Sequence, residues 1–188
     1  MKGIGEKFPK FSLKAYMPNE SSISNVDDLF MNIDNETYKD KWTVFFFYPK
    51  DFTFVCPTEI SGFNNLSKKF TDRDAQLIGG SVDSEFVHRA WCQHQSELKE
   101  LSFPLISDVT RDLSSSLGIL NDEGVTHRAT FISDPDGIIR HVSVNDLNVG
   151  RNPEEILRVL DALQTDELCP CNWTKGAETI DLKHELNK

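Results

Sequence analysis

One segment of the sequence carries residue types that could support redox chemistry, the stretch around Cys56. The apolar run 43–48 before it is typical of a buried strand, and Pro49 ends that run because proline cannot donate to a sheet ladder. Pro57 follows the cysteine, in the first-turn position that helices tolerate for proline. Cys56 is therefore expected at a helix N-terminus, where free backbone N–H groups favour a reactive thiolate, and Thr53 can bring a hydroxyl to the same pocket. The alternative is a structural cysteine that is buried after a strand.

The other three cysteines raise the question of a metal site. Cys169 and Cys171 form a Cys-x-Cys pair near the end of the chain, and Cys92 lies within a predicted helix. Structural zinc sites usually combine two cysteine pairs with two to four intervening residues, so one such pair is poor evidence for a metal. We expect no metal, and we expect Cys92 to be a bystander.

The pattern Pro49-x-x-x-Thr53-x-x-Cys56, extended by the Pro-Thr-Glu that follows, is similar to the active-site signature of the peroxiredoxins. The resemblance covers nearly the whole chain, and the order of its segments makes it specific. The paired tail cysteines resemble those of the alkyl hydroperoxide reductase C (AhpC) type among the typical two-cysteine peroxiredoxins. The matching segments beyond the signature are 81–84, 88–91, 103–108, 128–132, 134–137, 149–151 and 166–173.

This resemblance implies a thiol-dependent peroxidase that reduces hydrogen peroxide and organic hydroperoxides. Cys56 would be the peroxidatic cysteine, whose thiolate attacks the peroxide and becomes a sulfenic acid. The Thr53 hydroxyl would hydrogen-bond the substrate or the thiolate, and Pro49 would shield the sulfur from water. Arg128 would stabilise the thiolate and the breaking O–O bond, a role that suits a permanently charged side chain with several donors.

Two further residues are expected around the arginine. Glu59 could hold Arg128 in place, and Arg151 is a second candidate for the same network. The alternative for Arg128 is an ordinary salt-bridge partner on a strand.

The resemblance also implies how the enzyme is recycled. In the family, the tail crosses to the neighbouring subunit, so Cys169 is expected to be the resolving cysteine that forms an intersubunit disulfide with Cys56. Cys171 could act as an alternative resolver or pass the disulfide to a reductant. Because Cys56 and a tail thiol must meet, the first helical turn has to unwind.

The implied partners are a protein reductant and further copies of the chain. The reductant could be an AhpD-type adaptor, a flavoprotein reductase or thioredoxin, and antiparallel homodimers would assemble into a decamer or dodecamer ring. No haem or flavin is required. A peroxide-regulated holdase chaperone or redox sensor is the alternative outside catalysis, whereas a disulfide reductase would carry Cys-x-x-Cys at the helix start.

Composition bounds the remaining function classes. The 188 residues suit one domain, and 20 basic against 30 acidic side chains give a net charge of −10, which disfavours nucleic-acid binding. No apolar stretch approaches the roughly 20 residues that span a bilayer, and the N-terminus has no apolar signal region. We expect a cytoplasmic protein, in which disulfides are usually transient and catalytic.

The order of predicted elements indicates an α/β fold class with a mixed central sheet flanked by helices. The resemblance implies a thioredoxin-like fold with an N-terminal extension, residues 1–165 forming the peroxidase domain and 166–188 a C-terminal tail. A short alternating segment is expected at 10–13 and a polar surface loop at 18–25. Strands are expected at 43–48, 76–82, 104–107, 129–133 and 138–144, and helices at 57–70, 85–98 (with Ser84 as N-cap) and 153–164.

The sequence lacks two elements of the easily over-oxidised eukaryotic members, a Gly-Gly-Leu-Gly insertion near 99–104 and a C-terminal helix that ends in Tyr-Phe. Those elements slow the unfolding that exposes the sulfenic acid to its resolver. We therefore expect fast resolution and resistance to sulfinic acid formation.

Overall fold

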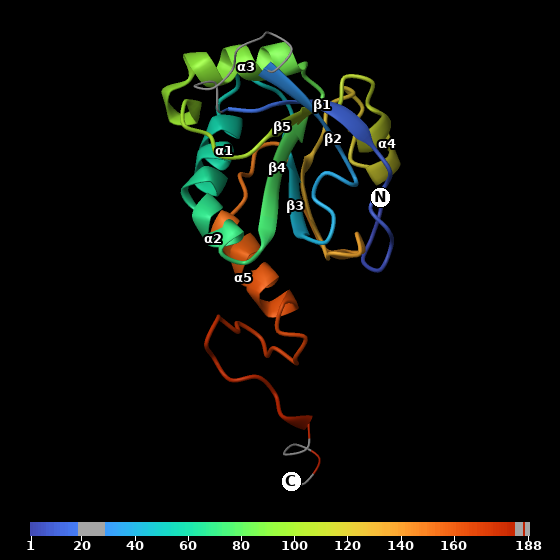
Figure 1. The fold of residues 1–188 in the computed structure, drawn as a ribbon, viewed down its shortest axis with the longest axis vertical. Helices are drawn as coiled ribbons and strands as arrows, with labels where there is room; N and C mark the ends of the chain where they lie inside the picture. The colour runs from blue at the N-terminus through green and yellow to red at the C-terminus, as the bar shows by residue number, and fades with distance from the viewer. Residues whose placement is uncertain (19–28, 183–185, 187–188) are drawn as a thin grey trace.

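A seven-stranded mixed sheet forms the centre of the protein in a computed structural model that describes residues 1–18, 29–182 and 186 (Figure 1). Its strand order is β2-β1-β5-β4-β3-β6-β7. Strands β3, β4 and β5 run parallel to one another, and the outer pairings are antiparallel. The strands are β1 (Ser12–Tyr16), β2 (Phe30–Asp34), β3 (Trp42–Phe47), β4 (Ala75–Ser81), β5 (Leu105–Ser107), β6 (Arg128–Ser133) and β7 (Ile139–Asn145).

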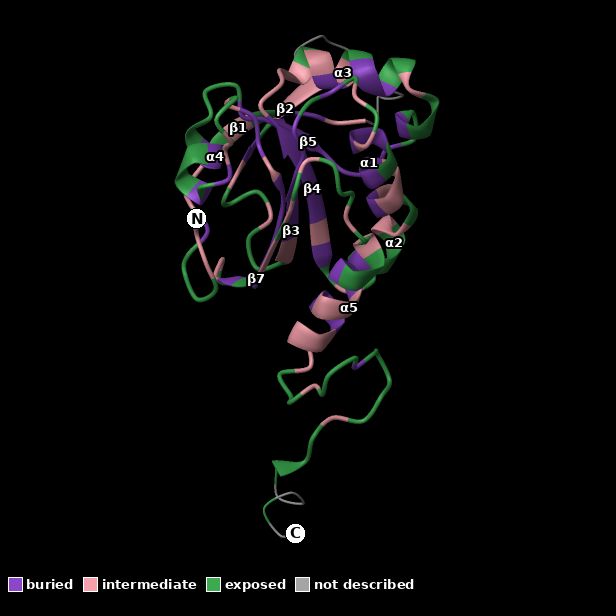
Figure 2. Cartoon of the chain, turned by 180° about the vertical axis from the view of Figure 1, so that it is seen from behind, coloured by how far each residue is buried: buried purple, intermediate pink, exposed green. Residues whose placement is uncertain are grey.

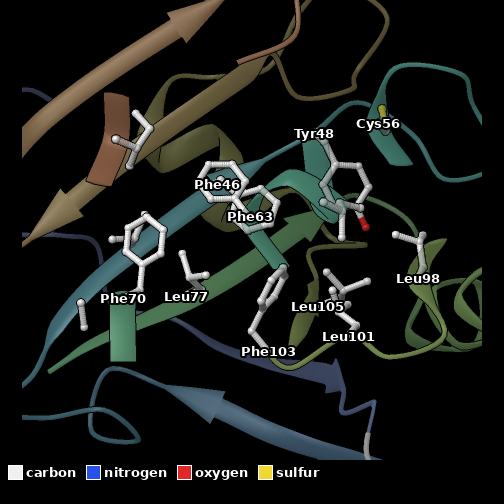
Figure 3. Close-up of a cluster of buried hydrophobic side chains, with 14 of the residues drawn as sticks. Phe46, Tyr48, Cys56, Phe63, Phe70, Leu77, Leu98, Leu101, Phe103 and Leu105 are labelled. Atoms are coloured by element: carbon white, nitrogen blue, oxygen red, sulfur yellow. The ribbon is translucent and has the colours of Figure 1, made fainter. Parts of the chain in front are cut away.

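Helices cover both faces of this sheet, which explains why its central strands are apolar throughout. Strand β3 alternates between the two layers: Phe46 packs towards α1, where its ring stacks on that of Phe63 at a centroid distance of 4.2 Å (Figure 3). Phe45 and Phe47 face the second layer, which contains α4 and the N-terminal segment. The helices are α1 (Cys56–Asn65), α2 (Ser67–Thr71), α3 (Glu85–His94), the 3₁₀ turn η3 (Ser96–Leu98), α4 (Asp112–Leu117) and α5 (Pro153–Leu163).

The predicted fold class is confirmed, and so are the predicted strands, each to within one or two residues. The single helix expected over 57–70 is wrong, because α1 ends at Asn65 and a separate short helix α2 follows. The helix expected over 85–98 ends at His94, and Ser84 caps it by accepting a hydrogen bond from the Val87 amide. Most of the predicted loop 18–25 lies outside the described residues. In the described part of the chain, no helix is both long enough and apolar enough to cross a bilayer.

The chain beyond α5 leaves the body of the protein and extends away from the sheet (Figure 1). This tail is largely exposed, in contrast to the buried central strands (Figure 2). Several contacts tie it to α5: Arg158 Nη1 donates to the Trp173 carbonyl at 2.9 Å, Lys175 Nζ lies 3.1 Å from Asp161 Oδ1, and Cys169 Sγ lies 3.8 Å from the Ala162 carbonyl. The tail therefore begins against α5 and then projects outward.

Candidate active site

Cys56 is the first residue of α1, at the end of the loop that leaves the last residue of β3. Its side chain is buried, at 1% exposure, within the core cluster beneath the helix (Figure 3). Pro57 follows in the first turn, as predicted, where its missing N–H costs no helical hydrogen bond. The residue before the helix, Val55, provides no side-chain cap. The helix start thus places a positive dipole end at the sulfur, although the free N–H groups expected there are engaged, because the Thr58 and Glu59 amides donate to the Val55 carbonyl.

Arg128, the first residue of β6, reaches across to this sulfur. Its Nη1 atom donates to Cys56 Sγ at 3.3 Å and to Glu59 Oε2 at 2.5 Å, while its Nε atom donates to the Leu147 carbonyl at 2.8 Å. Burial lowers the pKa of Arg128, but the hydrogen bond to Cys56 and the charge of Glu59 outweigh that effect and raise it. The guanidinium therefore stays charged and is held in one orientation by three acceptors.

Glu59 is shared by two arginines. Besides the bond from Arg128, it accepts hydrogen bonds from the backbone N, Nε and Nη2 atoms of Arg151 at 2.9, 2.8 and 3.0 Å. The Arg151 guanidinium also lies over the Phe46 ring, 5.4 Å from its centroid. The three charged side chains are each at most 5% exposed, and together they carry one net positive charge. A thiolate at Cys56 would neutralise that charge.

A cavity of about 230 Å³ opens onto the sulfur and has a mostly apolar lining. Pro49 and Thr53 lie in its wall, as the sequence predicts. The Thr53 hydroxyl, however, donates to the Lys50 carbonyl at 2.9 Å rather than to the sulfur. The size suits a small hydroperoxide with an apolar substituent. The lining residues are Pro49, Lys50, Thr53, Phe54, Val55, Cys56, Glu123, Val125, Arg128 and Leu147.

Sequence reasoning missed several residues of this pocket. The Leu147 carbonyl orients Arg128, yet a main-chain acceptor leaves no signal in residue type. At the mouth, Lys50 Nζ lies 3.5 Å from Glu123 Oε2, which joins the loop before Cys56 to the turn after α4. Both side chains are ordinary surface charges in the sequence, so only the fold reveals that they meet.

The tail cysteines lie at the other end of the sheet. Cys169 Sγ is 3.4 Å from the Thr165 hydroxyl and 3.8 Å from the Ala162 carbonyl, and Cys171 is exposed. Trp42 at the start of β3 lines the same open hollow as Leu163 at the end of α5 and Asp166 just beyond it, so the end of α5 lies beside the start of β3. Cys56, in contrast, follows the end of β3. The six residues of β3 span about 20 Å. The two sulfurs of one chain are therefore on opposite sides of the molecule.

Cys92 is buried in α3 and belongs to the core cluster beneath that helix. Across the residues that the structure describes, histidine, cysteine and carboxylate side chains form no group of three or more that could hold a metal ion.

Comparisons with known proteins agree with this geometry. The model of the AhpC/TSA family matches residues 4–142. Alkyl hydroperoxide reductase C of Mycolicibacterium smegmatis is 50% identical over 181 residues, which cover 95% of this chain and 93% of that protein. The solved structure of Mycobacterium tuberculosis AhpC has a TM-score of 0.85 at 49% identity, covering 92% of this chain and 99% of that one. A reduced two-cysteine peroxiredoxin from Plasmodium vivax has a TM-score of 0.87 at 32% identity, covering 98% of both chains. This chain therefore belongs to the AhpC/TSA family and is a relative of the alkyl hydroperoxide reductase C proteins and the two-cysteine peroxiredoxins.

Proposed function

We propose that the protein is a thiol-dependent peroxidase that reduces hydrogen peroxide and organic hydroperoxides at Cys56. The observation that carries this proposal is the bond from Arg128 Nη1 to the buried Cys56 Sγ, at 3.3 Å, inside a pocket that opens to solvent. A charged donor fixed on a sulfur at a helix start is suited to stabilise both the thiolate and the charge that develops during attack.

The first step is an attack of the Cys56 thiolate on the terminal peroxide oxygen. The O–O bond breaks, the sulfur becomes a sulfenic acid, and an alcohol or water leaves after taking up a proton. In our proposal, Arg128 stabilises the departing oxygen, while Glu59 and Arg151 keep Arg128 in place. Pro49 limits the access of water, and the Thr53 hydroxyl exchanges its Lys50 acceptor for a hydrogen bond to the peroxide.

In the second step a tail thiol attacks the sulfenic acid, which releases water and forms a disulfide. We assign this role to Cys169, with Cys171 as a second thiol that can accept the disulfide. The positions of Cys56 and Cys169 at opposite ends of β3 support a reaction between two subunits. In this scheme residues 1–165 form the peroxidase domain, and 166–188 form a tail that serves the neighbouring subunit.

The cycle closes when a dithiol protein reduces the disulfide. Candidates are an AhpD-type adaptor, a flavoprotein reductase and thioredoxin, and the exposure of Cys171 supports transfer of the disulfide to such a partner. We propose a cytoplasmic location and a decamer or dodecamer ring of dimers. A holdase chaperone or redox sensor is not favoured, because the relatives that this chain resembles are named as an alkyl hydroperoxide reductase and as two-cysteine peroxiredoxins.

The test is peroxide consumption by the wild type and by Cys56→Ser, Cys169→Ser and Cys171→Ser, with dithiothreitol as reductant and non-reducing gels. We expect Cys56→Ser to lose turnover, and Cys169→Ser to lose the covalent dimer that peroxide produces. Turnover that survives in Cys56→Ser would overturn the proposal. Loss of the dimer in Cys171→Ser alone would instead transfer the resolving role to Cys171.

A further inference from the structure

A buried acid–histidine pair anchors the loop that forms the wall of the Cys56 pocket. Asp51 lies in this loop, two residues from Pro49 and two from Thr53. Its Oδ2 atom is 2.7 Å from Nδ1 of His88 on α3, and the two side chains are 1% and 0% exposed. The Asp51 amide donates to Asp83 Oδ2 at 2.9 Å, so both the main chain and the side chain of this residue are held. The anchor fixes the middle of the pocket wall.

The geometry requires a proton in this pair. His88 Nε2 lies 3.1 Å from the Ile106 carbonyl, which can only accept, so Nε2 carries a hydrogen. On the other side of the ring, a hydrogen must lie between Nδ1 and Asp51 Oδ2, because two lone pairs would otherwise face each other across 2.7 Å. The pair therefore holds one shared proton, whichever atom bears it. Asp51 Oδ1 accepts no hydrogen bond from the described residues. Burying an ionised Asp51 without the shared proton would therefore cost still more free energy.

We propose that Asp51 and His88 are positioning residues of the peroxidase site, and that their shared proton keeps the loop 48–55 in the form that lines the Cys56 pocket. The inference rests on the proposed role of Cys56. Neither residue touches the sulfur or the cavity; both act through the loop, which carries Pro49 and Thr53 into the pocket wall. Loss of the proton at alkaline pH releases the loop and slows the attack on peroxide.

The groups around the pair favour, on balance, the protonated form of Asp51. Burial is the largest influence on Asp51 and raises its pKa; hydrogen bonding and the charge of His88 oppose this, and the charge of Asp83 adds to it. The Tyr48 hydroxyl lies 3.4 Å from His88 Nδ1. The pKa of Tyr48 lies well above its usual value, mainly because the side chain is buried and then because of the charges of Asp51 and Cys92. The phenol therefore remains protonated beside the pair.

The same loop has a second attachment that does not titrate. The Phe52 ring packs near that of Trp91 on α3 at a centroid distance of 6.1 Å, and the Thr126 hydroxyl donates to the Tyr48 carbonyl at 2.7 Å. These contacts keep the loop near the body of the protein when the proton is lost. The expected effect is therefore a shift of the pocket wall rather than unfolding, and misplacement by about 1 Å can cost about 100-fold in rate.

The test compares two variants that hydrogen-bond without titrating, His88→Asn and Asp51→Asn, with the apolar His88→Leu. The first readout is the stopped-flow rate of oxidation by hydrogen peroxide, followed by Trp fluorescence between about pH 6 and about pH 10. The second is hydrogen exchange of the 51–55 amides in the reduced protein, corrected for the intrinsic pH dependence. The matched control is His141→Asn, the same replacement on β7, where His141 pairs with Ile132 at the end of the ladder away from Arg128.

We expect the wild type and His141→Asn to lose rate and amide protection at alkaline pH. His88→Asn and Asp51→Asn should stay within about threefold of the wild type at neutral pH and lose the alkaline fall, whereas His88→Leu should be slower by about tenfold or more. An unchanged alkaline fall in both non-titrating variants would overturn the inference, and so would full speed in His88→Leu. If His88→Leu fails to fold, the other two variants still decide the question. If Cys56 proves not to be the reacting thiol, the hydrogen-exchange measurement still tests whether the Asp51–His88 pair holds the loop. Failure of the proposed function and failure of this inference are therefore distinguishable.

Discussion

Arg128 links Cys56 to the Glu59 carboxylate and to the main chain. One nitrogen donates to both Cys56 Sγ and Glu59 Oε2, and a second nitrogen donates to the Leu147 carbonyl. A lysine carries the same charge but has a single nitrogen on a flexible stem, so it cannot satisfy these acceptors in a fixed direction. The geometry of the guanidinium, and not its charge alone, is therefore what the site uses.

The first prediction concerns Arg128→Lys. We expect the second-order rate constant for oxidation of Cys56 by peroxide to fall by about 100-fold, the usual loss when one preorganised donor is removed. Stopped-flow fluorescence measures that constant directly. Arg140→Lys is the matched control, because Arg140 pairs with Asp134 on a half-exposed surface of β7. A lysine variant that matches the wild-type rate would show that charge alone suffices.

At the scale of elements, the start of α1 should respond to the oxidation state of the sulfur. A neutral sulfenic acid leaves Arg128 and Arg151 with only Glu59 to balance them, and a buried uncompensated charge costs several kcal/mol. The first turn of the helix has no side-chain cap to resist opening. Loss of charge on the sulfur thus favours the unwinding that resolution requires.

We therefore expect faster hydrogen exchange in the first turn of α1 after oxidation. The Cys169→Ser/Cys171→Ser double variant has no tail thiol and should stop at the sulfenic acid. One equivalent of peroxide should then lower the protection of the amides at 58–60, while an excess that forms the anionic sulfinate should restore it. Equal protection in the reduced and sulfenic forms would contradict an electrostatic cause.

The attachment of α5 gives a second prediction at this scale. Asp161 accepts hydrogen bonds from Arg73 Nε and Nη2 at 2.5 and 2.8 Å and also faces Lys175 of the tail. Burial alone would raise the pKa of Asp161, but the hydrogen bonds from Arg73 and Lys175 hold it below its usual 3.8. A depressed pKa means that the stabilisation is complete above pH 3.8 and is lost as the pH falls through the folded-state value.

Asp161→Asn should therefore lower the free energy of unfolding by about 2 kcal/mol at neutral pH, the range for hydrogen bonds to charged groups. Urea unfolding over a series of pH values should show a constant difference from the wild type down to about pH 4 and a shrinking one below it. Glu155→Gln, in the exposed pair with Arg158, should change the free energy of unfolding by less than about 1 kcal/mol. A difference that grows in acid would contradict this account.

The sequence predicts some elements well and others poorly for physical reasons. Strand β3 and helix α5 have clear apolar periodicity, and both appear where expected. Helix α4 was not predicted, because Asp112–Leu117 contains three serines, which are weak helix formers. Asp108 satisfies two backbone amides at the start of this helix, because its carboxylate accepts hydrogen bonds from the Leu113 and Ser114 amides at 3.3 and 2.7 Å. A cap that comes from outside the helix leaves no local signal.

The same distinction holds at the candidate site. The spacing from Pro49 to Cys56 is local, and the pocket contains its three named residues. The link from Arg128 to Glu59 joins residues 69 positions apart, so only the resemblance to a family could predict it. The main-chain acceptor at Leu147 and the anchor between Asp51 and His88 depend on the packing of the loop against α3 and β5, and residue type alone does not reveal them.

For the whole molecule, the decisive feature is that one chain keeps Cys56 and Cys169, the two sulfurs that we propose react, at opposite ends of the sheet. Cys56 follows the end of β3, and Cys169 lies by the end of α5, beside the start of β3. Opening the first turn of α1 frees only the few residues around Cys56. That short segment cannot carry the sulfur along the length of β3, which is about 20 Å. A second copy that runs antiparallel to the first would bring its own tail to the end of the sheet where Cys56 lies.

Mixed dimers test this arrangement. The Cys56→Ser chain has no peroxidatic thiol, and the Cys169→Ser/Cys171→Ser chain has no resolving thiol, so each should be inactive in steady-state turnover with a protein reductant. Mixed after mild dissociation, they should regain about one quarter of the wild-type turnover. Half of the dimers that form at random contain one chain of each kind, and each of these mixed dimers holds one complete site out of two. Non-reducing gels should then show a covalent dimer made of one chain of each kind. If the disulfide formed within a single chain, every mixed dimer would lack a complete pair, and the mixture would remain as inactive as its parents.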